Sequence, residues 1–395
     1  MKSPLHIALA TLGLSCAAAI SLGLSRFSFA LLLPPMREDL QWSYFLAGSM
    51  NTANAFGYLS GALVTPLLLQ RMSTNLLLLV GAMATAIFML FTALSDSPAA
   101  LLVLRYLAGI ASAFSFVTGG ILTTRLGNLY GRRIGLILGT YYGGAGLGIV
   151  LSAQLIPQAL SYGQRTEWPR GWQIAWITLA ALCILLTIAL AKSASTVHAK
   201  SDTPSMHTRF RAVEFGYGLV GYGLFGVGYI GYMTFIVAFL REHGMATSSI
   251  TAFYTLLGIG VCMSSFLWAW LLDRYKDGRP MAILNLLLSI ATAIPLISDH
   301  IVPLFFSGLL FGSVFLSVVA STTALVRHNV PPSSWSSGIS AFTTVFALGQ
   351  IVGPSITGWL SDGQGGLERG FIFSAMSLFA GSVISLRQRH VAHKH

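Results

Sequence analysis

The chain has 395 residues, of which 54% are hydrophobic and only 9% are charged, a balance that excludes an ordinary soluble domain. We expect an all-α integral membrane protein. A net charge of +11 is compatible with nucleic-acid binding, but the lysines and arginines lie in short loops between apolar runs, where they set orientation in the membrane. We therefore expect membrane lipid around the chain and no nucleic-acid partner.

Twelve apolar runs are long enough to form membrane helices, since about 20 apolar residues cross the ~30 Å hydrocarbon core. The first run continues beyond any point at which a secretory signal would be cleaved, so we predict that it is the first membrane helix. The predicted spans are Leu5–Leu33, Tyr44–Leu69, Asn75–Leu94, Ala99–Leu122, Ile134–Ile156, Trp172–Ala191, Val213–Leu240, Ile250–Leu272, Met281–Ile297, Val302–Val326, Ser336–Leu360 and Phe371–Leu386.

Arg26 is the one charge inside the first of these runs. An arginine near the centre of a membrane helix costs roughly 2.5 to 3.5 kcal/mol on insertion scales, which makes it a functional candidate. It precedes Pro34 by eight residues and so lies about 12 Å below the outer end of its helix.

Basic residues are distributed unequally between the two sides of the membrane. With an even number of spans, both termini lie on one side, and the loops on that side carry most of the lysines and arginines. The opposite loops carry only Arg37, Arg165, Arg170, Arg241 and Arg369. Since basic loops stay cytoplasmic, we predict a multi-pass plasma (inner) membrane protein with both termini in the cytoplasm.

The longest polar stretch divides the chain into two parts. It predicts a cytoplasmic linker over residues 193–210, between an N-terminal six-helix bundle (1–192) and a C-terminal six-helix bundle with a short basic tail (211–395). Glycines of the two parts repeat at a constant offset of 203 residues, as in Gly57 with Gly260 and Gly109 with Gly312. Two parallel repeats predict a site between them, near the middle of the bilayer.

Several motifs resemble those of the major facilitator superfamily, and the resemblance covers nearly the whole chain. It implies the twelve-helix transporter fold, with no enzyme activity and no cofactor. The motifs are Val103–Gly109, which resembles the fourth-helix arginine motif, Leu271–Arg279, which resembles the signature cytoplasmic loop, the glycine-rich Gly139–Gly148, and Gly349 to Asp362. Within the superfamily, Leu24–Met36 and Tyr222–Tyr232 are similar to the YbfB/YjiJ-like permeases, whose substrates are mostly unassigned.

The signature loop departs from the family pattern. Gln70 stands where the first half usually carries an acidic residue, whereas Asp273 holds that place in the second half. We expect a one-sided conformational latch made by Asp273 and Arg274, with Arg71 as the basic residue of the first half. The alternative is that these are solvated loop charges.

Arg105 lies about 10 Å deep on a helix that enters from the outside, by the same rise per residue, and so shares the level of Arg26. No acidic residue lies in the outer half of any predicted span. Because a guanidinium binds a carboxylate or phosphate with two parallel hydrogen bonds, we predict that one or both arginines hold the anionic group of a substrate. In the alternative, Arg26 reaches outward to Glu38, Asp39 or Asp96, and Arg105 braces helices.

Further polar residues are candidates for the same cavity, because they repeat at helical spacing. Tyrosines on glycine-rich helices also serve as ordinary packing residues, and that alternative stays open. The candidates are Asn51, Asn54 and Tyr58 on the second predicted helix, Tyr222, Tyr229 and Tyr232 on the seventh, and Gln350 on the eleventh.

Glu214 is the only carboxylate inside a predicted span, near its cytoplasmic end and three residues from Arg211. Proton-driven transporters commonly use such a group, so Glu214 is a candidate for energy coupling. The alternative is an interfacial ion pair with Arg211.

The function that we predict is secondary active or facilitative transport of a small organic solute, an organic anion, by alternating access of the two halves. A drug or toxin efflux permease, with a mostly apolar and aromatic cavity, is one alternative. A non-transporting membrane sensor or assembly protein is another. The sequence has no metal-binding pattern such as HExxH and no catalytic constellation, so we expect no metal, no cofactor and no enzyme. We expect a monomer.

Overall fold

The computed structural model describes residues 4–129, 134–197 and 210–391, and all regular structure in these ranges is helical. Most of the predicted linker, residues 198–209, lies outside the described residues, as does part of a predicted basic loop, residues 130–133. The helices of the first half are α1 (Pro4–Ala18), η1 (Ala19–Phe27), α2 (Phe29–Leu40), α3 (Tyr44–Leu68), α4 (Thr74–Ala93), α5 (Pro98–Leu129), α6 (Ile134–Arg165) and α7 (Gly171–Ala194).

The second half repeats the plan with a few short additional helices. Its elements are η3 (Ala212–Phe215), α8 (Gly216–Glu242), α9 (Thr247–Leu267), α10 (Ala269–Arg274), α11 (Arg279–Ile297), α12 (Ile301–Asn329), η4 (Pro332–Ser334), α13 (Trp335–Ser361) and α14 (Gly366–Ser385).

Eleven helical segments in the described part of the chain are long and apolar enough to cross a membrane. The twelfth predicted span is α3, which has the length but is not among the eleven. Its sequence includes Asn51, Asn54 and several serines and threonines, which lower its hydropathy. The predicted all-helical membrane fold is confirmed, and the predicted count of twelve is supported to within one helix.

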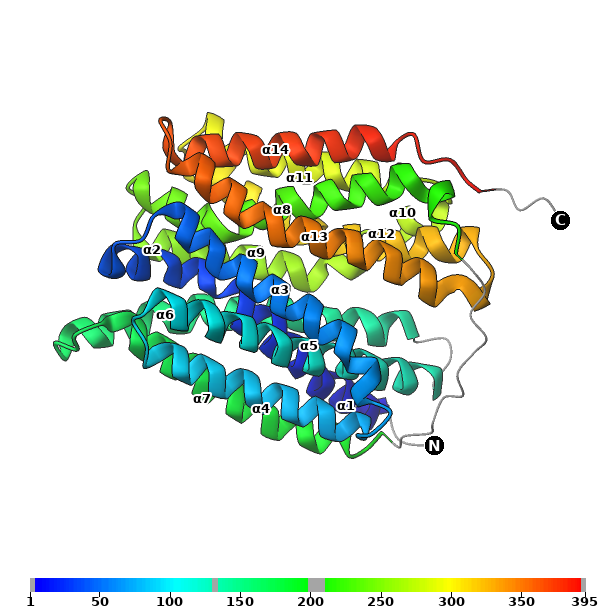
Figure 1. The fold of residues 1–395 in the computed structure, drawn as a ribbon, viewed down its shortest axis with the longest axis horizontal. Coiled ribbons are helices and arrows are strands. Elements are labelled where there is room, and N and C mark those ends of the chain that lie inside the picture. The colour runs from blue at the N-terminus through cyan, green and yellow to red at the C-terminus, as the bar shows by residue number, and fades with distance from the viewer. Residues whose placement is uncertain (1–3, 130–133, 198–209, 392–395) are drawn as a thin grey trace.

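The long helices run side by side along the longest axis of the molecule, in two groups (Figure 1). Helices α1 to α7 form one group and α8 to α14 the other, and both chain termini lie at the same end. Within the described ranges, the main contacts between the groups are made by α3 with α13, α6 with α9, and α2 with α8. The site between the halves is therefore built from the first, second and fifth crossings of each half.

The glycine repeat corresponds to a repeat in helix packing. A Cβ atom at Gly57 would lie 1.9 Å from the carbonyl oxygen of Tyr106, and one at Gly260 would lie 2.7 Å from that of Leu309. Tyr106 and Leu309 are themselves related by the same offset of 203 residues. The contact of α3 with α5 is thus reproduced by that of α9 with α12, and in both a glycine permits the close approach.

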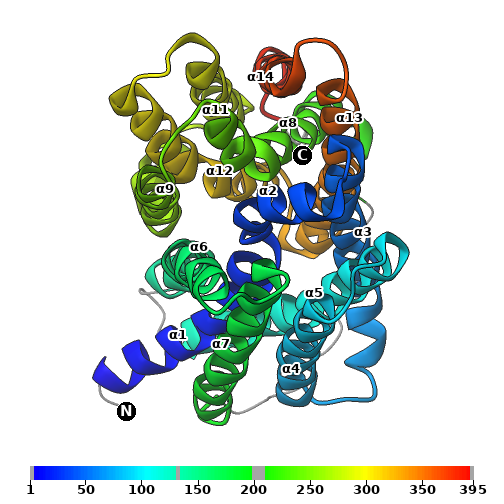
Figure 2. The same cartoon turned by 90° about the vertical axis from the view of Figure 1, so that its left-hand side faces the viewer.

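The end of the molecule away from both termini, which we call the outer end, is held together between the halves (Figure 2). The carboxylate of Asp362, directly after α13, accepts hydrogen bonds from the backbone N–H groups of Tyr44 and Phe45, at 2.6 and 2.8 Å. These donors open α3, where the first N–H groups have no partner within the helix. A carboxylate of the second half therefore caps a helix of the first.

Further polar contacts surround this cap. The Tyr44 hydroxyl donates a hydrogen bond to Glu242, the last residue of α8, and Arg37 approaches the same carboxylate at 4.0 Å. Arg241 pairs with Glu38 at 3.4 Å. In each of these contacts one partner comes from α2 or α3 and the other from α8, so they close the outer end.

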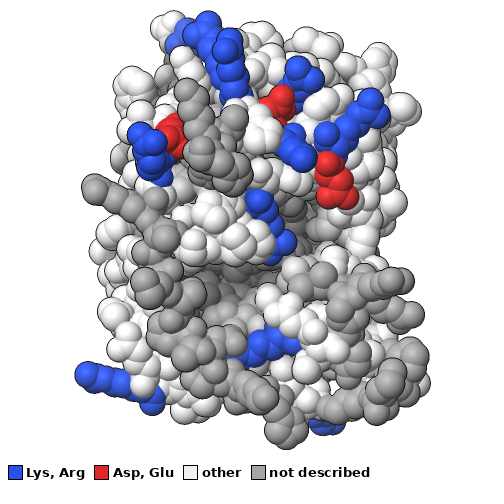
Figure 3. Space-filling view, turned by 90° about the vertical axis from the view of Figure 1, so that its right-hand side faces the viewer, with Lys and Arg blue, Asp and Glu red and all other residues white. Residues whose placement is uncertain are grey.

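The opposite end of the molecule is different. Seen from the side of the termini, the surface is hollowed between the two halves, with Lys or Arg side chains at the upper and the lower rim (Figure 3). The acidic side chains visible on this face belong to the upper half and lie away from the hollow. The halves are therefore joined at the outer end. At the end that carries the termini, a hollow lies between them beside the contact of α6 with α9, where a Cβ atom at Gly139 would lie 3.0 Å from the Phe266 ring.

The predicted latch is not engaged in this arrangement. Asp273 and Arg274 on α10 are exposed, as is Arg71 after α3, and no ion pair joins them within the described ranges. The Arg274 guanidinium instead lies 5.8 Å from the ring centroid of Tyr275. A latch at this end would need the two halves to approach each other there.

Candidate functional site

The first crossing changes its helix type where it carries Arg26. Residues Ala19–Phe27 form a π-helix, η1, in which the N–H of Ser28 donates to the Gly23 carbonyl at 3.0 Å, and all nine residues are buried. Such turns occur often at functional sites. Gly23 lies against α6, because a Cβ atom there would be 2.5 Å from the Cα of Gly148. The glycine-rich stretch of α6 thus lets η1 pack closely and fixes the position of Arg26.

Arg26 itself is buried, and no acidic side chain in the described part of the chain pairs with it. Its side chain is 3% exposed, and its Nε and Nη2 atoms have no hydrogen-bond partner among the described residues. The acidic residues it might have reached are paired elsewhere. Arg170 binds Asp39 at 3.3 Å and Asp96 at 2.9 Å, which lowers the pKa of the Asp96 carboxyl, and Glu38 pairs with the arginine near the end of α8. The structure therefore differs from the alternative in which Arg26 reaches outward.

Arg105 occupies a different environment. Its Nη1 donates to the Ser25 carbonyl at 2.7 Å, and its Nη2 donates to the Asn51 side chain at 3.0 Å. The guanidinium also lies 4.8 Å from the ring centroid of Phe29 and 5.8 Å from that of Trp176. These contacts join α5 to the first, second and sixth crossings of its own half. This is the arrangement expected of a helix brace.

The predicted asparagines bridge elements beside this brace. Asn51 donates to Thr234 of α8 at 2.8 Å, and Tyr254 of α9 donates to the Phe27 carbonyl at 2.6 Å, so both hydrogen bonds cross between the halves. Asn54 donates to a carbonyl of α5 at 3.1 Å, and its Oδ1 atom has no partner within the described ranges. The asparagines therefore lie next to Arg105 in the chain's interior, where they mainly connect helices.

Four of the predicted residues form one group between the halves. Gln350 of α13 donates a hydrogen bond to the Tyr229 oxygen, and the positive charge of Arg26 lies within electrostatic range of the hydroxyls of both Tyr229 and Tyr58. Tyr58 comes from α3, Tyr229 from α8 and Arg26 from η1. The two halves thus contribute to one polar cluster around the buried guanidinium.

Aromatic rings extend this cluster along the second half. The rings of Tyr222, Phe225, Tyr229 and Phe346 lie nearly parallel, and we call them the aromatic wall. Phe346 stacks on the other three at centroid distances of 4.9, 5.4 and 5.7 Å. The sequence prediction included the two tyrosines but not the phenylalanines. The spacing of the three wall residues on α8, at i, i+3 and i+7, was the signal that could have included Phe225.

The first half presents aromatic side chains across from this wall. Phe116 of α5 contacts both Tyr58 and Tyr142, with ring centroids 6.1 and 6.0 Å away. Tyr142 is 38% exposed although it lies within α6, and its ring also meets that of Tyr141 edge to face, with centroids 5.4 Å apart. Tyr142 belongs to the glycine-rich stretch of α6 and was missed because that stretch was considered only for its resemblance to the superfamily motif.

Tyr232 does not belong to this group. Its hydroxyl forms a hydrogen bond with Ser307 at 2.8 Å, and its ring stacks on Phe311 with centroids 4.0 Å apart, inside the second half. Around the helix, Tyr232 is offset from Tyr229 by about 60°, and its contacts show that it faces the interior of the second half. Helical spacing alone had placed the two on one face.

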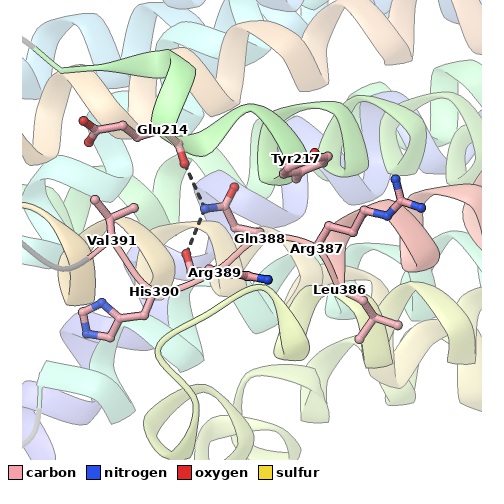
Figure 4. Close-up of a pocket in the computed structure, with 8 residues that line it drawn as sticks. All are labelled: Glu214, Tyr217, Leu386, Arg387, Gln388, Arg389, His390 and Val391. Carbon is pink, nitrogen blue, oxygen red and sulfur yellow. Dashed lines mark hydrogen bonds between the residues drawn. The ribbon is translucent and has the colours of Figure 1, made fainter.

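Glu214 lies at the end of the molecule that carries the termini, far from Arg26 along the helices. It pairs with Arg211 at 2.6 Å, as in the alternative of an interfacial ion pair, and its carbonyl accepts a hydrogen bond from Gln388 at 3.0 Å. A recess of about 840 Å³ opens beside it (Figure 4). The recess is lined by Glu214, Tyr217, Leu386, Arg387, Gln388, Arg389, His390 and Val391.

No group of three or more histidine, cysteine or acidic side chains within the described ranges is placed to hold a metal ion. The three cysteines, Cys16, Cys183 and Cys262, are free. The chemistry offered by the site between the halves is therefore that of a buried guanidinium, tyrosine hydroxyls and aromatic surfaces.

Comparisons with known proteins agree with this architecture. A family profile described as "Uncharacterised MFS-type transporter YbfB" matches residues 18–386. No curated protein gives a significant match. The fold is similar to that of a bacterial homologue of the human lysosomal transporter Spinster in an inward-facing, unoccupied conformation, with a TM-score of 0.69, 16% identity, and coverage of 98% of this chain and 96% of that chain.

Two further structures are similar in the same way. The nucleoside transporter NupG gives a TM-score of 0.70 at 15% identity, over 97% of this chain and 98% of that chain. A mutant of NupG gives a TM-score of 0.73 at 14% identity, over 95% and 98% of the two chains. At these identities the likeness concerns the fold alone.

Proposed function

The chain belongs to the YbfB-like family of major facilitator transporters, and from this premise we propose that it carries a small organic anion across the membrane by alternating access of its two halves. As a multi-pass membrane transporter, it moves its solute through a site between the bundles. We propose Arg26 as the residue that binds the anionic group, with Tyr58 and Tyr229 beside it.

The unpaired guanidinium of Arg26 is the observation that supports this proposal. A charge in a low-dielectric interior is costly unless it is paired, and no acidic residue of the sequence lies in the outer half of a predicted span. A bound carboxylate or phosphate would supply the missing acceptors for Nε and Nη2, in the geometry that a guanidinium favours.

The contacts at the two ends of the molecule support alternating access. The hollow opens at the end of the termini, which the distribution of basic residues assigns to the cytoplasm of an inner-membrane protein. In the opposite state, the Asp362 cap on α3 would be broken, and Asp273 could then meet basic residues of the first half. Glu214 is paired at the interface, and we assign it no coupling role. We propose that the monomer performs the whole cycle.

The aromatic wall favours one second candidate, the efflux of amphipathic drugs. Stacked rings and exposed aromatic side chains suit such molecules, many of which are cationic. A cation would meet the positive charge of Arg26 and no buried carboxylate, so we rank this function below anion transport.

Transport by purified protein in proteoliposomes tests the proposal. We expect Arg26→Gln to reduce the counterflow of organic anions at least about tenfold, since a hydrogen-bonded ion pair in a buried site is lost. Arg26→Lys should retain part of the activity, because it keeps the charge but not the planar fork. Arg165→Gln, at an exposed arginine near the end of α6, is the matched control and should transport like the wild type.

Wild-type transport by Arg26→Gln would remove this arginine from the mechanism. A complete absence of flux for anions, cations and neutral solutes would favour a non-transporting sensor or assembly protein. Flux of organic cations that is independent of Arg26 would favour efflux.

A further inference from the structure

The aromatic wall has a regular geometry that simple space filling does not require. The interplanar angles of the stacked pairs lie between 10 and 19° among Tyr222, Phe225, Tyr229 and Phe346. Phe315 continues the series beyond Tyr229, at 10° and 5.8 Å. Buried aromatic pairs meet either edge to face or in offset stacks, and here all the neighbouring pairs of this series take the second arrangement. A run of parallel rings offers a surface on which one more planar ring can stack.

Phe346 is the member of this wall that remains accessible. Its side chain is partly exposed, whereas Tyr222, Phe225 and Tyr229 are 2% exposed or less. Its plane is held by the three rings behind it. An incoming ring would therefore meet Phe346 first, at a surface whose orientation is already set.

The hydroxyl of Tyr229 is prepared to donate to an anion. Gln350 donates a hydrogen bond to the Tyr229 oxygen, which leaves the hydroxyl proton free for another acceptor. Arg26 lies within electrostatic range of the same hydroxyl. A donor from each half thus surrounds one position at the deep end of the wall.

The charges buried between the halves have one sign. Arg26 and Arg105 are each 3% exposed or less, and Arg327 is exposed near the termini end of α12. The acidic residues within the described ranges lie in loops or close to helix ends. The interior between the halves therefore attracts anions and repels cations.

We propose that the transported anion is an aromatic carboxylate, with its carboxylate on Arg26 and Tyr229 and its ring stacked on Phe346. This inference rests on the proposed function and narrows its substrate class. The negative face of an aromatic ring disfavours a carboxylate directly above it. In the proposed complex, the ligand's ring therefore lies on the aromatic wall, and its carboxylate lies at a separate place, on the Arg26 guanidinium.

A saturated carboxylate of the same size distinguishes stacking from simple apolar burial. Cyclohexanecarboxylate carries more apolar hydrogen-rich surface than benzoate, and a merely hydrophobic site would bind it at least as well. An aromatic wall should reverse this order. We expect benzoate to bind about 2- to 10-fold more tightly than cyclohexanecarboxylate.

Calorimetric titration of the full-length protein in detergent measures these affinities. The probes are benzoate, cyclohexanecarboxylate, the neutral isostere benzamide, and succinate as an anion without a ring. Benzamide should bind at least about tenfold more weakly than benzoate, because it cannot accept the charge-assisted bonds. Phe346→Leu should remove the preference for benzoate and leave the affinity for cyclohexanecarboxylate nearly unchanged. Phe306→Leu, at a phenylalanine of α12 that is 56% exposed, is the matched control.

The outcomes separate this inference from the proposed function. Equal or reversed affinities for the two ring acids overturn the aromatic class and leave the anion site standing, as does binding of succinate without either ring acid. Benzamide that binds as tightly as benzoate and ignores Arg26→Gln overturns the proposed function. Failure of the folded wild type to bind any of the anions overturns both.

Discussion

At the scale of single residues, two arginines that the sequence predicts at a similar depth in the membrane have different surroundings. Arg105 donates two hydrogen bonds, at 2.7 and 3.0 Å, and lies against two aromatic rings. Arg26 lacks partners for Nε and Nη2 within the described ranges. The residue type is the same and the predicted depths are similar, so only the neighbours distinguish a brace from a candidate for binding.

This contrast predicts opposite effects on stability. Arg105→Gln should lower the free energy of unfolding by about 2 to 4 kcal/mol, because the shorter side chain leaves the Ser25 carbonyl and Asn51 without a charged donor. Arg26→Gln removes a charge that has no partner in the protein, and should leave the stability unchanged or higher. Thermal unfolding in the absence of solute measures both. An Arg105→Gln protein as stable as the wild type would contradict the assignment of Arg105 as a brace.

At the scale of helices, the two halves repeat their closest contacts. A Cβ atom at Gly109 would lie 2.2 Å from the Asn54 carbonyl oxygen, and one at Gly312 would lie 2.1 Å from that of Leu257. Asn54 and Leu257 differ in chemistry but occupy equivalent places. The backbone contact is therefore conserved between the halves, while the side chains that face the site have diverged.

Alanine substitutions at two equivalent glycines should reveal this duplication. Gly57→Ala and Gly260→Ala each bring a methyl group against a carbonyl oxygen of the neighbouring helix, and should destabilise the protein by about 1 to 3 kcal/mol. Gly135→Ala is the matched control, because a Cβ atom there meets nothing within 4 Å. Its effect should be neutral or favourable, since alanine is the better helix former. Thermal unfolding checks all three, and equal stability of the three variants would refute the close-contact argument.

At the scale of the whole molecule, closure at one end is set by a few cross-half contacts. Asp362 caps two N–H groups of α3, and Arg241 pairs with Glu38 beside it. The corresponding acidic residue of the other end, Asp273, is exposed and makes no ion pair in the described part of the chain. Under the proposed alternating access, the state of the transporter depends on which set of contacts is made.

Asp362→Asn should shift the balance toward a state that is open at the outer end. The amide is a weaker acceptor than the carboxylate, and a loss of about 1.4 kcal/mol changes the ratio of two states tenfold. Spin labels at Glu167 and Asp299, in a protein without native cysteines, would report the separation of the halves by pulsed electron resonance. Glu368→Gln, at an exposed residue of α14, is the control and should leave the distances unchanged. Unchanged distances in Asp362→Asn would show that this cap does not govern closure.

The sequence by itself determined the helices, their approximate number and the duplication. In a bilayer each crossing must satisfy its own backbone hydrogen bonds, so long apolar runs can only be helices, and the glycine offset of 203 residues relates the two halves directly. The sequence also identified Arg26, because a charge in such a run is conspicuous. The family assignment followed from motifs that are local in the chain, such as Val103–Gly109.

Only the tertiary structure decided which side chains meet. Spacing on one helix grouped Tyr232 with Tyr229, but rotation of α8 turns Tyr232 toward Ser307. Spacing offered no means to find Phe346, whose neighbours lie on another helix, or Asp362, which caps a helix of the other half. Contacts between helices depend on their rotation, register and close approach, and the π-turn at Arg26 changes the rotation locally. A one-dimensional pattern does not contain these quantities.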